Sequence, residues 1–171
     1  VKLADDAITF LMESVKIRKQ LLGANDVGVA SALQNVGDAY LHRAVAVEGS
    51  AIDDTAKALD ALETSLKLRH ALRVSAASTD PLTDPMAEAI CHFLIGQTKE
   101  VRHEYDDAQK HFVGALKLIR TEGEQRVASI SRDEISSNAK QIITELEAIN
   151  LWAAQILGHV ARVHHAKKAY S

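Results

Sequence analysis

The sequence has 171 residues but a single cysteine, two prolines and few aromatic residues. The lone cysteine, Cys91, excludes a disulfide within the chain and suits a reducing compartment, the nucleus or the cytoplasm. Aromatic residues make up only 4% of the chain, which argues against a β-rich fold and against stacking sites for single-stranded nucleic acid. A net charge of −3 implies no basic surface for nucleic-acid phosphates, and no apolar run reaches the length of a membrane span.

Apolar residues instead recur every three or four positions along most of the chain, as amphipathic helices require. Between these stripes lie residues typical of helix ends: Gly23 as a stop, and Asn25 or Asp26, Asp53 or Asp54, Asp84 with Pro85, and Tyr105 as starts. The clearest linker, rich in Ser, Thr, Asp and Pro, spans 75–85. Because Val1 is not an initiator methionine, we expect the chain to be part of a longer protein.

One helix of the chain is repeated. The segment around Leu11 recurs around Leu62 and again around Phe112, at offsets of 51 and 50 residues. A helix pair cannot bury its own apolar stripe, whereas stacked pairs can. The expected fold is therefore all-α: a right-handed α-solenoid of helix pairs in residues 1–125, closed by a long C-terminal helix in 126–171.

These helices resemble the tetratricopeptide repeat over residues 4–120. The large, aliphatic, glycine and aromatic positions of the family's first helix are matched by Leu33, Val36, Gly37 and Tyr40. The small, large and small positions of its second helix are matched by Ala108, Phe112 and Ala115. In such a contact the small residues let two helix backbones approach, and the large residue fills the groove between them.

Two subfamilies tolerate repeats as long as these. Residues 15–41 look like a repeat of the kinesin-light-chain type, although Ala24-Asn25-Asp26 replaces the usual His-Pro-Asp. Three segments in order look like the interrupted repeat of histone chaperones related to nuclear autoantigenic sperm protein (NASP). These are residues 6–20, then 86–88 with 105–119, and a long charged helix over 121–168. We favour the second resemblance, which implies a core histone as the partner.

The C-terminal helix has two candidate roles. Ser131 and Glu134 form a capping box at its expected start. Apolar residues then alternate at spacings of four and three through a seam that includes Ile135, Ile142, Leu146, Ile149, Ile156 and Val160. The helix is expected to cap the last repeat, to join two copies of the chain through this seam, or to do both.

The sequence contains no convincing motif for catalysis, metal binding or phosphate binding. Its glycines form no phosphate loop. His159, His164 and His165 are spaced so that all three cannot share one helix face, and adjacent Cys91 and His92 point about 100° apart on a helix. We expect a buried thiol at Cys91, no enzyme activity, no metal and no cofactor.

What remains is a binding surface on the first helices of the pairs. The expected partner-binding residues are Ser31, Gln34, Asn35, Asp38, His42, Glu88, His92, Gln97 and Glu100. This set contains carboxylates and no Lys or Arg, which favours a basic peptide, and the NASP resemblance makes it a core histone of the three–four pair. Two alternatives are a kinesin-light-chain-like adaptor for acidic-aromatic or leucine-rich peptides and a structural oligomeriser built on the C-terminal seam.

Overall fold

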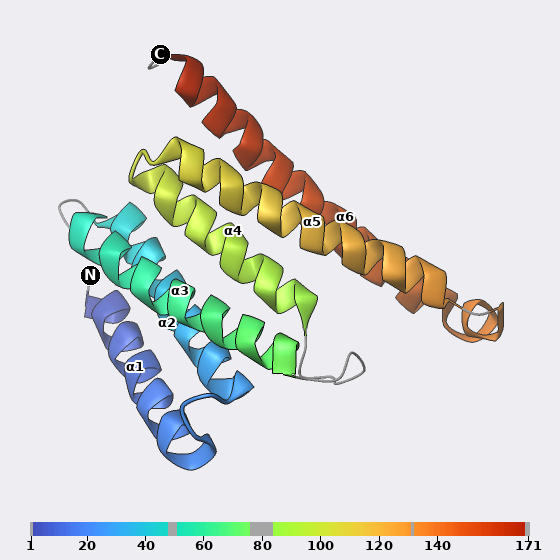
Figure 1. Cartoon of the computed structure of the whole chain (residues 1–171), viewed down its shortest axis with the longest axis horizontal. Coiled ribbons are helices and arrows are strands. Elements are labelled where there is room, and N and C mark those ends of the chain that lie inside the picture. Colours follow the sequence, from blue (N-terminus) through green and yellow to red (C-terminus); the bar gives the residue numbers. More distant parts are fainter. Residues whose placement is uncertain (1, 48–50, 76–83, 131, 170–171) are drawn as a thin grey trace.

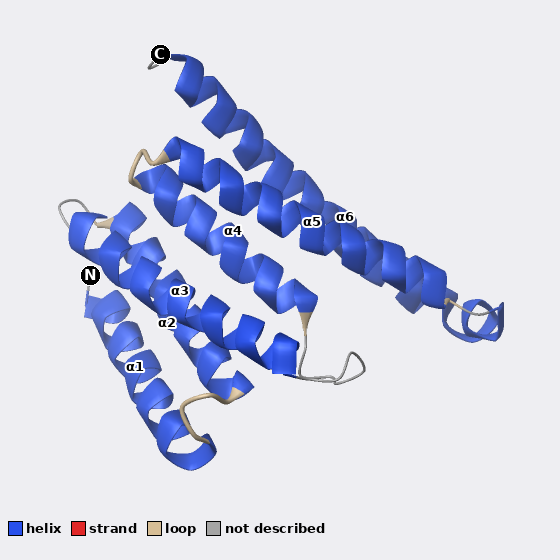
Figure 2. Ribbon diagram, viewed as in Figure 1, coloured by secondary structure: helices blue, strands red, loops and turns tan. Residues whose placement is uncertain are grey.

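The computed structural model describes residues 2–47, 51–75, 84–130 and 132–169. These residues form six helices and no strands (Figures 1 and 2). The helices are α1 (Lys2–Leu22), α2 (Val27–Ala46), α3 (Ala51–Ser75), α4 (Pro85–Val101), α5 (Tyr105–Ser129) and α6 (Arg132–Ala169). The prediction of an all-α protein is confirmed for this part of the chain. Most of the predicted linker and the capping residue Ser131 lie outside it.

Several helix ends follow from single residues, as predicted. Gly23 ends α1 with φ of +89°, a conformation that other residues adopt at a cost. The Asp26 carboxylate caps α2 by accepting the backbone N–H of Gly28 at 2.6 Å. Pro85 is the first residue of α4, and the Asp84 side chain accepts the backbone N–H of Met86 at 2.9 Å.

The expected cap of the third helix is wrong. α3 already begins at Ala51, so Asp53 and Asp54 lie inside its first turn. Asp54 is buried and accepts two hydrogen bonds from the Arg43 guanidinium, at 2.8 and 2.6 Å. Arg43 also pairs with Asp5, so one guanidinium links α1, α2 and α3, and these carboxylates raise its pKa. A carboxylate before an apolar stripe can either cap a helix or form an ion pair. The sequence pattern does not distinguish these roles, and the predicted helix cap was the wrong one.

Each helix packs against the next one along the chain, and α2–α4 and α4–α6 are also in contact. In Figure 1 the helices therefore follow one another across the molecule from α1 to α6. α3 packs against both α2 and α4, and α5 packs against both α4 and α6. α1 packs against α2 alone among the described helices.

Two helix crossings repeat the same contact. A Cβ atom at Gly37 of α2 would overlap the buried Leu62 side chain of α3. A Cβ atom at Gly96 of α4 would lie 2.6 Å from the buried Phe112 ring of α5. Both glycines thus let a large side chain reach the facing helix backbone. The large residues of the two contacts, Leu62 and Phe112, occupy corresponding positions of the sequence repeat.

The hydrophobic core has two clusters, one around Leu62 and one around Phe112. Part of the C-terminal seam belongs to the second cluster: Ile156 is one of its buried members, and Ile149 and Val160 pack against it. Ile142 of α6 is also buried, and Leu146 is half-buried. The Ile135 side chain lies outside the described residues.

α5 runs through the expected domain boundary at 125/126 and packs against α6. The seam is therefore used within the chain, and pairing two copies through it would require α6 to leave α5. Among the described helices, none combines the length and apolar character needed to cross a bilayer.

Candidate functional site

The helices α2, α4 and α6 together line a groove with a volume of about 360 Å³, called here the inner groove. It is lined by Asp38, Leu41, His42, Val45, Gln97, Glu100, Val101, His159 and Arg162. Four of the predicted partner-binding residues meet here, two from α2 and two from α4. The predicted Asn35 is exposed on α2 but does not line the groove.

Glu100 lies at the centre of a polar cluster in this groove. Its carboxylate oxygens lie 2.7 Å from His159 Nδ1 and 3.2 Å from Arg162 Nε. Gln97 Nε2 lies 3.2 Å from the other nitrogen of the His159 ring. The same ring packs edge-on against Phe93, with centroids 5.1 Å apart. Packing and hydrogen bonding together fix the His159 ring in position.

The expectation that the groove contains no Lys or Arg is wrong. Arg162 lines it and is ion-paired with Glu100, so the Glu100 charge is already compensated. Arg162 comes from α6, a helix that we expected only to cap the fold or to pair with another copy. Sequence reasoning missed His159 and Arg162 because their positions depend on how α6 packs against α4. The available signal was a polar residue, His159, within the mainly apolar stripe of a helix.

Asp38 keeps a more available carboxylate than Glu100. Its side chain is 44% exposed, and its one charged-pair contact among the described residues is with His42 Nε2, at 3.4 Å, which is an ion pair only when that imidazole is protonated. His42 is itself well exposed to solvent. An exposed i,i+4 pair of this kind is weak, so a charged group from another molecule can compete for the carboxylate.

Two predicted residues of α2 face inward. Arg69 of α3 donates hydrogen bonds to Ser31 Oγ at 3.1 Å and to Gln34 Oε1 at 3.2 Å. The thiol of Cys91 lies 3.2 Å from the same Gln34 oxygen and 3.5 Å from Ser65 Oγ. Burial raises the pKa of Cys91 and disfavours its thiolate. The expected burial of Cys91 is confirmed, and Ser31 and Gln34 belong to helix packing.

The predicted residues Glu88 and His92 are also used inside the fold. Glu88 is buried and pairs with Arg73 of α3 at 3.2 Å. His92 Nδ1 lies 3.0 Å from His111 Nδ1 across the α4–α5 interface. Burial lowers the pKa of both histidines, which favours their neutral forms. Neither residue is placed to meet a partner in the inner groove.

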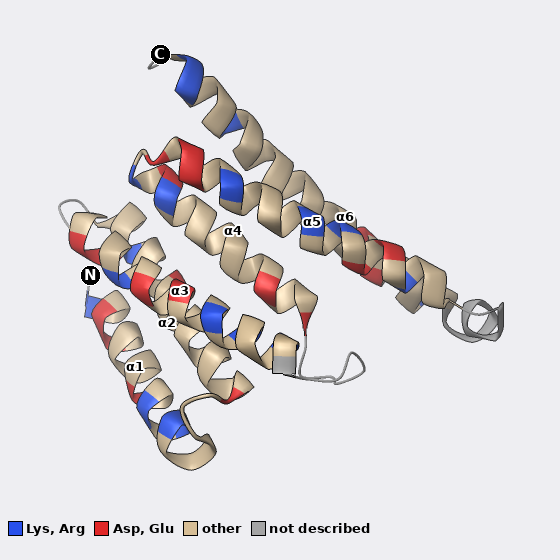
Figure 3. Cartoon of the chain, viewed as in Figure 1, with Lys and Arg blue, Asp and Glu red and all other residues tan. Residues whose placement is uncertain are grey.

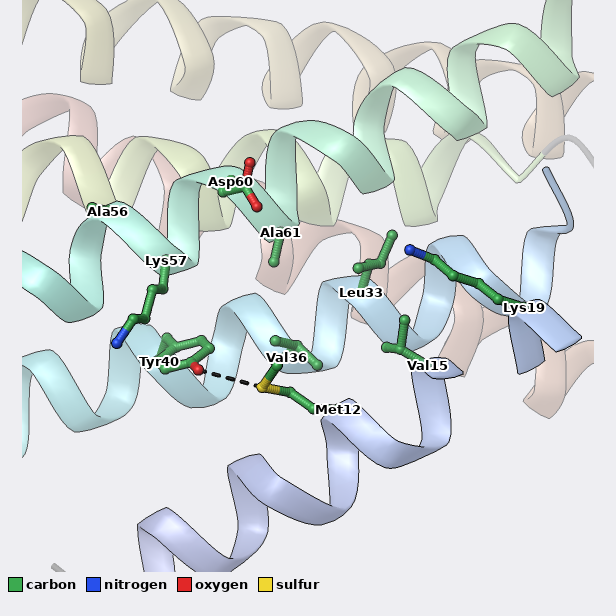
Figure 4. A pocket seen from close by; sticks show the side chains of 10 residues that line it. All are labelled: Met12, Val15, Lys19, Leu33, Val36, Tyr40, Ala56, Lys57, Asp60 and Ala61. Atoms are coloured by element: carbon green, nitrogen blue, oxygen red, sulfur yellow. Dashed lines mark hydrogen bonds between the residues drawn. The ribbon is translucent and has the colours of Figure 1, made fainter. Parts of the chain in front are cut away.

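A second hollow, of about 570 Å³, is lined by residues of α1, α2 and α3 (Figure 4). Its lining is mostly apolar: Met12, Val15, Leu33, Val36, Tyr40, Ala56 and Ala61, with Lys19, Lys57 and Asp60 as the charged members. The Tyr40 hydroxyl lies 3.5 Å from the Met12 sulfur, as the dashed line in Figure 4 shows. This second hollow has room for apolar side chains of another molecule.

The charges of the molecule are mixed rather than segregated. Basic and acidic positions are interspersed over the helices in Figure 3. Within the described ranges, no three His, Cys, Asp or Glu side chains converge as metal ligands.

No family model matches the chain. No curated protein matches it significantly either.

Proposed function

We propose that the protein is a non-enzymatic binding module, built as a right-handed α-solenoid of tetratricopeptide-like helix pairs, whose inner groove holds a segment of a partner protein. The repeated glycine crossings at Gly37 and Gly96 support the repeat. The groove adds apolar side chains, Leu41 and Val101, to hydrogen-bonding groups from three helices. Such a combination suits a few side chains of a docked peptide or helix.

The proposed ligand is a basic segment, and the observation that carries this choice is the available carboxylate of Asp38. A partner Arg can form two hydrogen bonds with it, and a second cation can compete with the exposed Arg162 for Glu100. The resemblance to NASP makes a helix of a core histone the proposed source of this segment. The proposed role is then to shield a histone surface, in the nucleus or the cytoplasm.

Arg162 favours a second candidate, a kinesin-light-chain-like adaptor. Its side chain is exposed at the groove, where it can bind a carboxylate of an acidic-aromatic or leucine-rich peptide. In this alternative Glu100 and His159 hold Arg162 in place, and Asp38 repels the ligand.

Two charge reversals distinguish the candidates because they act in opposite directions. Binding of core histones and of an acidic-aromatic peptide is measured by isothermal titration calorimetry at one low ionic strength, where charge contacts are least screened. For a basic ligand, Asp38→Lys weakens binding by about tenfold and Arg162→Glu strengthens it. For an acidic ligand both signs are reversed.

The matched control is Glu147→Lys. It changes the net charge by the same amount as Asp38→Lys, but Glu147 is an exposed residue of α6 outside the groove. It should leave both affinities unchanged. Histone binding that is insensitive to Asp38→Lys would refute the histone-chaperone proposal. Absence of binding to both ligand classes would refute the inner groove as the site.

A further inference from the structure

α1 differs from its counterparts in the sequence repeat because none of the described helices covers one of its faces. α3 and α5 each lie between two other helices, and their large repeat residues, Leu62 and Phe112, are fully buried. Of the helices that the structure describes, α2 alone packs against α1, and the counterpart residue Leu11 is half-buried. A side of the helix that a neighbouring helix covers in α3 and α5 is therefore exposed in α1.

That side of α1 carries a regular apolar stripe. Its members alternate at spacings of four and three residues: five apolar residues, Leu3, Ala7, Phe10, Ile17 and Leu21, and one polar residue, Ser14, whose hydroxyl lies 3.4 Å from Arg18 Nε. The four large members are exposed, and the Phe10 side chain remains 74% accessible. The inward side of the helix, with Ile8 and Val15, is separate and buried against α2. The spacing is that of a seam in a two-stranded coiled coil.

We propose that two copies of the chain associate through this stripe, with their α1 helices antiparallel. A two-fold axis near residue 12 places Ala7 of one copy opposite Ile17 of the other, and Phe10 opposite Ser14. The same register places Leu3 opposite Leu21 at both ends. Each inner layer then pairs a large side chain with a small one, which fills space evenly. A parallel, in-register pair would instead stack Phe10 on Phe10 and Ala7 on Ala7, with crowding at one layer and a gap at the next.

The surface beside the stripe leaves room for this packing. A trough of about 510 Å³ separates α1 from the C-terminal half of α2 and is lined largely by small residues, including Ala4, Ala7, Ala39 and Ala46. The opposing Ile17 is placed beside Ala7 at the edge of this trough.

The exposed stripe is also large enough for association. It offers on the order of 500 Å² of apolar surface per copy, so a pair would bury roughly 1,000 Å². This area lies at the lower limit of specific interfaces and predicts a weak, concentration-dependent dimer.

Sedimentation equilibrium of the whole chain tests the association. The unmodified chain should show a monomer–dimer equilibrium with a Kd on the order of 10 μM. Phe10→Glu should raise the Kd at least about tenfold, because it buries a charge at the centre of the stripe. Ile52→Glu is the matched control: Ile52 of α3 is 84% exposed, and its substitution should leave the Kd unchanged.

Circular dichroism should show the same helix content in both variants. A chain that remains monomeric at high concentration, or a dimer that Phe10→Glu leaves intact, overturns the proposal.

Disulfide trapping tests the orientation. Ala7→Cys and Ile17→Cys are made singly and then mixed under mild oxidation; native Cys91 is buried and reacts poorly. The antiparallel pair predicts a disulfide between the two different variants and little between identical ones. Disulfides mainly between identical variants would contradict the antiparallel pair. Neither experiment depends on the inner groove, so the dimer and the proposed function can fail independently.

Discussion

The first and last helices, α1 and α6, carry the same kind of apolar spacing but have different surroundings. The α6 seam packs against α5 and α4, where Ile156 and Val163 are fully buried. The stripe of α1 around Phe10 and Ile17 is exposed, although the opposite side of the same helix is part of the core. A four-three spacing therefore defines a face that can pack against a helix, but it does not define which helix covers it.

The difference has a physical origin in the neighbouring helices. α5 presents Phe112, Ala115 and Ile119 to the second core cluster, so α6 finds a complementary apolar surface within its own chain. α2 is the single described neighbour of α1 and covers only one side of it. Four predictions test how far this contrast between a covered and an uncovered helix extends.

The largest expected effect is a difference in stability between substitutions of one isoleucine in α6 and one in α1. Ile156→Ala should lower the free energy of unfolding by about 3–4 kcal/mol, because it leaves a cavity among fully buried side chains. Ile17→Ala should lower it by less than about 1 kcal/mol in the monomer, because this side chain is exposed. Urea denaturation at a low protein concentration measures both values. Equal losses would show that the α1 stripe is covered in solution.

The second prediction concerns the polar attachment of α1. Arg43→Met should cost about 3 kcal/mol, because it removes the guanidinium that binds the buried Asp54 and the half-buried Asp5. His42→Ala, a change at an exposed neighbour, should have little effect on stability. Hydrogen exchange should also show faster opening of α1 in the Arg43 variant. Unchanged protection in α1 would mean that apolar packing alone holds this helix.

The third prediction compares a glycine at a crossing with one in open space. Gly96→Ala should destabilise by about 2 kcal/mol, because the added Cβ lies 2.6 Å from the Phe112 ring. Gly158→Ala should stabilise by up to about 1 kcal/mol, because no atom lies within 4 Å and alanine favours the helix. The change in Tm measured by thermal unfolding shows whether each variant is less or more stable than the unmodified chain. Adding Phe112→Leu to Gly96→Ala should recover part of the loss, and the absence of recovery would contradict the proposed contact.

The smallest expected effect is a pH dependence of the α4–α5 interface. Burial lowers the folded-state pKa of His92 and His111, so the unfolded chain binds more protons once the pH falls below about 6.5. Stability should therefore decrease from pH 7 towards pH 5 until the folded-state pKa values are passed. Urea titrations should show a flatter profile for the double variant His92→Gln/His111→Gln. A double variant whose stability falls as steeply with pH as that of the unmodified chain would refute the assignment.

Much of the local structure could be predicted because it depends on neighbouring residues. Gly23, Asp26 and Asp84 act on the backbone within two residues, so their roles at helix ends are visible in the sequence. Gly37 and Leu62 were each recognised as repeat positions, but the contact between them was not predicted, because it joins two different helices.

The candidate site was only partly predictable because charge partners come from distant helices. Asp38 and Glu100 reach the inner groove, whereas the equally polar Glu88 is buried against Arg73. The expected absence of cations failed at Arg162, which lies 62 residues beyond Glu100 in the chain. A helical pattern places side chains around their own axis, but it does not show which of those faces meets another helix.

The sequence by itself determined an all-helical chain, the ends of several helices and a repeated helix pattern, because these depend on backbone preferences and short spacings. Only the tertiary structure decided that the α6 seam is buried, that the α1 stripe is open, and that Arg162 enters a groove with Asp38. Those outcomes depend on which apolar faces meet in space. Several pairings satisfy the same periodicity, and the total buried surface selects among them.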